Sequence, residues 1–109
     1  MDYVEKDKEY KSHIKSAILE IEKYTAGLDF DAFLKSNIVK SATIRQLEII
    51  GEAAKRLSAE FILDYHEIEW NKVVGMRNKL IHDYFEVNWE IVWDTVKNNL
   101  PKLKAILER

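Results

Sequence analysis

The chain has 109 residues, of which 47% are hydrophobic and 33% are charged, and its formal net charge is −2. This length and balance predict one globular domain over residues 1–109 and exclude a disordered chain or a pair of domains. The absence of cysteine excludes disulfides and thiolate metal sites, and the slight acidity argues against binding nucleic acid through overall charge. No apolar run is long enough to span a membrane and the N-terminus lacks a signal-peptide core, so we expect a cytoplasmic protein.

The spacing of apolar residues predicts an all-α fold. Only three glycines and one proline interrupt the chain, which favours long helices over a turn-rich β fold. Apolar positions recurring every three or four residues predict helices over 2–25, 30–35, 38–57, 59–65 and 70–84, then one beginning at Asn88 and a short terminal one ending near Leu107. An interruption is expected at 98–101, with Pro101 giving a kink or a fresh first turn. The result is an antiparallel bundle of four to five helices.

Capping residues stand at several of these boundaries. The candidate N-caps are Asp29, Ser36 or Asn37, Ser58 and Asn88, and Gly27 suits a left-handed C-cap. The apolar face of the 38–57 helix begins with Ile38 and is widened by Ile44 and Ile49, which predicts burial on two sides.

Two polar clusters in the first seventy residues have competing interpretations. Arg45, Glu48 and Glu52 follow one another at helical steps, either as a ladder of surface charge pairs or as a polar wall facing the functional stretch described next. His66 stands close to Glu67 and Glu69, but this spacing does not suit one helix face and no second His or Cys is near. We therefore expect no metal site there.

Residues 75–84 place strong chemistry inside an apolar run. Arg77 carries a planar, permanently charged fork that fits phosphate oxygens. His82 titrates near neutral pH and can move a proton. The Tyr84 hydroxyl is a donor, an acceptor and a possible nucleophile. The competing interpretation is a core-lining helix whose polar residues point to water.

The helical period makes the geometry of this stretch difficult for one chain. At ~100° per residue, Arg77 and Tyr84 share nearly one face, whereas Arg77 and His82 lie roughly 140° apart. Three arrangements bring them together: the Arg side chain wraps around, the helix breaks near His82, or a second copy of the chain supplies the missing half. The third arrangement predicts a two-fold homodimer with both motifs facing the interface.

The stretch resembles the signature of HEPN-domain proteins, and within them the HepT-type toxins of prokaryotic toxin–antitoxin pairs. The resemblance rests on Arg77 and Asn78 followed by His82, Asp83 and Tyr84. It extends to segment 44–54, to Trp93 and to the tail at 100–103, so it covers nearly the whole chain in order. One departure is Lys35-Ser36, where the group often carries an acidic residue after Phe33-Leu34.

The resemblance implies a metal-independent endoribonuclease that needs no cofactor and acts as a homodimer. Carried over to this sequence, Arg77 and His82 are the catalytic pair, and Asn78, Asp83 and Tyr84 support them or contact RNA. It also implies a partner, an MntA-type minimal nucleotidyltransferase antitoxin that adenylates Tyr84.

Two other functions stay open from the residues alone. One is a non-catalytic helical module that binds nucleotide or a nucleotidyltransferase. The other is a helical dimerisation domain in which Arg77 and His82 have no chemical role.

Overall fold

A computed structural model describes the backbone of residues 2–81 and 87–109, and the side chains of residues 2–76 and 87–109. The elements are α1 (Asp2–Thr25), α2 (Phe30–Lys35), α3 (Asn37–Lys55), α4 (Ala59–Asp64), α5 (Trp70–Ile81), α6 (Trp89–Asp94), the π-helical turn η2 (Thr95–Asn99) and α7 (Leu100–Leu107). No strand occurs in these described ranges, so the all-α prediction is confirmed there.

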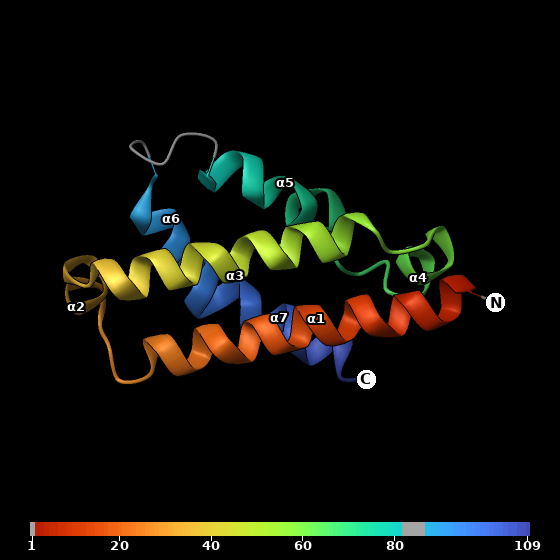
Figure 1. Ribbon diagram of the computed structural model, residues 1–109, viewed down its shortest axis with the longest axis horizontal. Helices are drawn as coiled ribbons and strands as arrows, with labels where there is room; N and C mark the ends of the chain where they lie inside the picture. The colour runs from red at the N-terminus through yellow and green to blue at the C-terminus, as the bar shows by residue number, and fades with distance from the viewer. Residues whose placement is uncertain (1, 82–86) are drawn as a thin grey trace.

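The long helices lie side by side as an elongated bundle (Figure 1). α1 and α3 run antiparallel along its length, α5 packs on the outer side of α3, and the α6–η2–α7 run lies behind α1 and α3. The short helices α2 and α4 lie at opposite ends of the bundle. This arrangement agrees with the predicted antiparallel bundle.

Local capping chemistry explains where most of the helices begin. The side chains of Asp29, Ser36, Ser58 and Asn88 accept hydrogen bonds from the backbone N–H three residues later, at Ala32, Val39, Phe61 and Ile91. Each bond satisfies a donor that has no partner within its own helix. Gly27 has φ +76°, as expected of a left-handed cap.

The core lies between α1 and α3 and is closed by α6 and α7. Its fully buried apolar side chains are Ile14, Ile18, Ile21, Phe33, Leu47, Ile50, Val92 and Leu107. Ile44 is buried and Ile49 is partly buried, as the width of the apolar face predicted. The prediction for Ile38 is wrong, because this side chain is 83% exposed in the first turn of α3.

The C-terminal run stays helical through the predicted interruption at 98–101. Pro101 lies in the first turn of α7, the helix position that best tolerates proline. The chain reaches it through η2, in which the Leu100 N–H donates to Thr95 O five residues back. A wider π turn therefore replaces the expected break, and Leu100, Leu103 and Leu107 remain buried beyond it.

Candidate functional site

The structure places the first part of the predicted motif on α5. The backbone of Arg77 and Asn78 lies in the second half of this helix, as the sequence predicted. Their side chains are outside the described set, and His82, Asp83 and Tyr84 lie outside the described residues altogether. The predicted meeting of Arg77 with His82 therefore stays a prediction, and the site is built here from the surroundings of α5.

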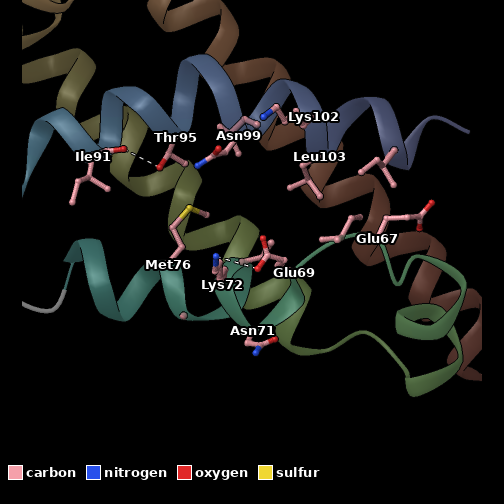
Figure 2. A pocket seen from close by; sticks show the side chains of 15 residues that line it. Glu67, Glu69, Asn71, Lys72, Met76, Ile91, Thr95, Asn99, Lys102 and Leu103 are labelled. Carbon is pink, nitrogen blue, oxygen red and sulfur yellow. Dashed lines mark hydrogen bonds and ion pairs between the residues drawn. The ribbon is translucent and has the colours of Figure 1, made fainter.

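A groove of about 580 Å³ runs between α5 and the α6–η2–α7 run, and we call it the C-terminal groove (Figure 2). Its apolar lining is Ile68, Val73, Met76, Ile91, Leu100, Leu103 and Ile106. Glu67, Glu69, Lys72, Asn99 and Lys102 are among its polar lining residues. An apolar floor with polar groups around it is the usual anatomy of a protein–protein interface.

Three residues show that this groove is open. The Met76 side chain extends from α5 toward the C-terminal run in Figure 2, and it is only partly buried. Ile91 is 44% exposed on the opposite wall. A Cβ added at Gly75, on α5, would meet no atom within 4 Å. The flank of α5 that faces the C-terminal run therefore has room for another element.

The helical register relates Arg77 to this groove. Arg77 follows Val73 by four residues and Met76 by one, and both of these line the groove. At ~100° per residue, the Arg77 position lies about 40° around the helix from Val73. The catalytic candidate thus stands one turn beyond a groove-lining residue, at the edge of the open flank.

Ile91 is a groove residue that the sequence reading missed. Trp89, Val92 and Trp93 recur at three- and four-residue steps along α6 and form its apolar stripe, and Ile91 falls outside it. The sequence does carry a signal for Ile91, because it is an apolar residue that lies off the core-facing stripe. Exposed apolar residues that group together mark interaction surfaces.

The polar cluster predicted on α3 lines a second groove. Arg45, Glu48 and Glu52 border a hollow of about 600 Å³ together with Glu9, Tyr10, His13, Ile49, Ala53 and Arg56, so α1 and α3 form its walls. Its acidic and basic residues are mixed, which does not suit a groove that holds a polyanion through charge alone.

One titratable group of the C-terminal groove has a shifted pKa. Hydrogen bonding with its own backbone, and then with the Arg109 guanidinium, lowers the pKa of Glu67 below its ordinary value of 4.5.

Among the described residues, no three His, Asp or Glu side chains are grouped as metal ligands. No helix within the described ranges is long and apolar enough to cross a bilayer.

Comparison with known proteins places this sequence in a family. The family described as "Ribonuclease HepT-like" matches residues 14–109. The chain is 42% identical over 102 residues to "Probable ribonuclease HepT" of Thermococcus cleftensis, covering 94% of this chain and 93% of that protein. No solved structure shows a significant match.

Two further relatives carry related names. A "Putative RNase" of Caldanaerobacter subterraneus is 38% identical over 104 residues, covering 92% of this chain and 93% of the relative. A "Putative RNase" of Methanocaldococcus jannaschii is 45% identical over 90 residues, covering 82% and 74%. The family match covers most of the chain and agrees with the resemblance seen in the motif, so this protein belongs to the HepT-like ribonuclease family.

Proposed function

We propose that this protein is the toxin of a toxin–antitoxin pair, a metal-independent endoribonuclease that cleaves RNA at an interface between two copies of the chain. The observation that carries the proposal is the family match over residues 14–109, which includes the whole Arg77–His82 motif. The position of Arg77 on a helix with an open flank supports it.

The dimer forms through the C-terminal groove. Met76, Ile91 and Ile106 are partly or largely exposed in the isolated chain, and apposing two grooves about a two-fold axis would remove these side chains from water. The same axis would bring two α5 helices together, with Arg77 of each chain near the junction. Two copies of the motif then supply two guanidinium groups and two imidazoles to one cleft, which relieves the roughly 140° separation within a single helix.

The motif residues divide the chemistry of RNA cleavage between them. One imidazole, from His82, takes the proton of the 2′-hydroxyl, whose oxygen attacks the adjacent phosphorus. An imidazolium from the second chain protonates the departing 5′-oxygen. Arg77 stabilises the charge that develops on the phosphorane oxygens. Asn78 and Asp83 orient these groups through hydrogen bonds.

The proposed partner is an MntA-type minimal nucleotidyltransferase, which silences the toxin by adenylating Tyr84. The added phosphate brings negative charge and bulk to the place where the RNA phosphate must bind. Repulsion between two phosphates then excludes the substrate, in the way that phosphorylation disrupts an anion site.

The proposal is tested by expressing the chain without a partner and by incubating the purified protein with RNA in a metal chelator. We expect growth arrest and RNA cleavage from the natural protein, and loss of both in Arg77→Ala and His82→Ala. His66→Ala is the matched control, because His66 is exposed and its Nδ1 lies 3.2 Å from Leu63 O just after α4. Full activity in His82→Ala would contradict the catalytic role. A protein that binds the nucleotidyltransferase and leaves all RNA intact would instead support the non-catalytic binding module.

A further inference from the structure

An aromatic cluster joins α2 to α6 at one end of the bundle, next to the end of α3 that follows α2. Phe33 is fully buried, and its ring centroid lies 4.9 Å from that of Trp93 and 6.0 Å from that of Trp89. Both indoles are only partly buried, so part of each reaches the surface. The cluster therefore has a fixed inner side and an accessible outer side.

A lysine lies over each indole. Lys40 Nζ is 5.0 Å from the ring centroid of Trp89, and Lys97 Nζ is 4.6 Å from that of Trp93. The two indoles are four residues apart on α6, so the two pairs lie about 6 Å apart along one helix face. We call these four residues the Lys–Trp surface.

Two acids near this surface are already engaged, whereas Glu90, the neighbour of Trp89, is exposed. Asp31 pairs with Lys35 at 2.9 Å, and Asp94 accepts a hydrogen bond of 2.6 Å from Asn98. Within the described ranges, neither Lys40 nor Lys97 forms an ion pair. Both ammonium groups therefore keep a charge that a phosphate could neutralise, even though the whole chain carries a net charge of −2.

The sequence places this surface close to the proposed catalytic residues. Trp89 follows His82 by seven residues, and seven residues of extended chain reach about 25 Å at most. A scissile linkage bound at His82 would therefore lie within about 25 Å of Trp89, a distance that a few nucleotides of single strand can cover.

We propose that the Lys–Trp surface binds the single-stranded RNA that flanks the cleavage point, with bases stacking on Trp89 and Trp93 and phosphates pairing with Lys40 and Lys97. This inference rests on the proposed ribonuclease function and names the form of its substrate. Aromatic faces combined with basic side chains are how proteins hold single strands without reading a sequence. Each ammonium moves from its ring to a phosphate, and the ring face it leaves is taken by a base, whose stacking is stronger than an exposed cation–π contact.

The test uses the His82→Ala protein, so that binding is measured without cleavage. The probe is a labelled single-stranded RNA of about 12 nucleotides, within the range that such surfaces cover. Its binding is followed by anisotropy and by quenching of tryptophan fluorescence. Trp70 is 6% exposed and gives a constant background. We expect quenching by single-stranded RNA, and none by inorganic polyphosphate or by duplex RNA of the same length.

The decisive variant is the double substitution Lys40→Gln with Lys97→Gln. Each lost phosphate contact lowers affinity about fivefold at ~0.1 M salt and reduces the salt dependence of log K by about 0.7. The matched control, Lys6→Gln with Lys8→Gln, removes the same charge from exposed positions of α1, near the opposite end of the bundle (Figure 1). We expect the control to bind RNA like the parent.

Three results would overturn the inference. The two double variants could lose RNA affinity equally, or RNA could bind without quenching tryptophan fluorescence. The lysine substitutions could also leave RNA affinity unchanged and weaken only the binding of a nucleotidyltransferase. A parallel cleavage assay of the otherwise natural chain separates the two proposals. Cleavage that is insensitive to Lys40 and Lys97 would contradict only the Lys–Trp surface. RNA binding that depends on both lysines, without any cleavage, would contradict only the proposed catalytic function.

Discussion

Asp7 on α1 accepts two hydrogen bonds from Ser58, 51 residues further along the chain. One comes from the Ser58 backbone N–H at 2.9 Å and the other from its hydroxyl. The same Ser58 oxygen accepts from Phe61 N and caps α4. A carboxylate that is only 8% exposed thus fixes the α3–α4 corner against the first helix.

Replacing Asp7 with Ala should destabilise the fold by about 1–3 kcal/mol, because Ser58 is left with donors that have lost their acceptor. Urea unfolding followed by circular dichroism measures this loss. Asp64→Ala is the control, since Asp64 is exposed on α4 and should change stability by less than ~0.5 kcal/mol. Equal effects of the two substitutions would show that the corner does not depend on Asp7.

Removing the ring of Phe33 should cost far more. Phe33 is 0% exposed and packs against two indoles, so Phe33→Ala should lower stability by about 3–5 kcal/mol. Tryptophan emission in the native state should shift to the red as water reaches Trp89 and Trp93. Ile38→Ala removes a side chain that is 83% exposed and should change stability by under ~0.5 kcal/mol. A small loss of stability in Phe33→Ala would mean that the two indoles close the core without the Phe33 ring.

Glu67 gives a pH dependence with a definite sign. Its folded pKa lies below the ordinary 4.5, so its contribution to stability is present above that value and is lost as pH falls through the folded pKa. In an NMR titration of the natural protein, the Glu67 carboxyl should therefore titrate below 4.5. In Arg109→Ala the pKa should rise only partway, because the larger cause is the hydrogen bond with the Glu67 backbone. A complete return to the ordinary value would assign the whole shift to Arg109.

Ile91→Asp should convert the proposed dimer to a monomer and abolish RNA cleavage with it. The substitution places a charge on the wall of the C-terminal groove, while an acid in the first turn of α6 is favourable for the isolated chain. Analytical ultracentrifugation measures the assembly. Leu63→Asp is the control, since Leu63 is 71% exposed on α4 and does not line the groove. If Ile91→Asp still formed a stable dimer, the interface would lie outside the C-terminal groove.

A second substitution, which should stabilise the monomer, tests the same interface from α5. Gly75→Ala adds a methyl group where no atom lies within 4 Å in the isolated chain, and it should stabilise α5 by up to ~1 kcal/mol. If a second helix approaches there, the methyl group should weaken dimerisation. Unfolding at low concentration and sedimentation at high concentration separate the two effects, and an unchanged dimer would place Gly75 outside the interface.

Local chemistry made much of the fold predictable from the sequence. Asp29, Ser58 and Asn88 cap helices because their side-chain oxygens bond to donors three residues away, and Ser36 rather than Asn37 is the N-cap of α3. The predicted end of the second long helix at 57 is two residues late, because Arg56 N–H already closes the last turn on Ala53 O.

Non-local packing explains what the sequence did not reveal. Burial of Asp7 depends on a partner 51 residues away, and Ile38 is exposed although its neighbour Val39 packs against the core. For the candidate site, the helical position of Arg77 followed from periodicity, whereas the open groove beside it depends on where the C-terminal run packs. The convergence of Arg77 with His82 remains a prediction, because it depends on side chains outside the described set.

The π turn at Thr95–Asn99 has a consequence for how relatives of this chain can differ in length. A π turn holds one residue more than the α turn it replaces, so deleting the exposed Lys97 would let the segment relax to ordinary α geometry. Leu103 and Leu107 would then keep their orientation toward the core. The same deletion in the middle of α3 would rotate every later residue of that helix by about 100°. We therefore expect relatives of this chain to differ by single-residue insertions or deletions between α6 and α7, but not within α3.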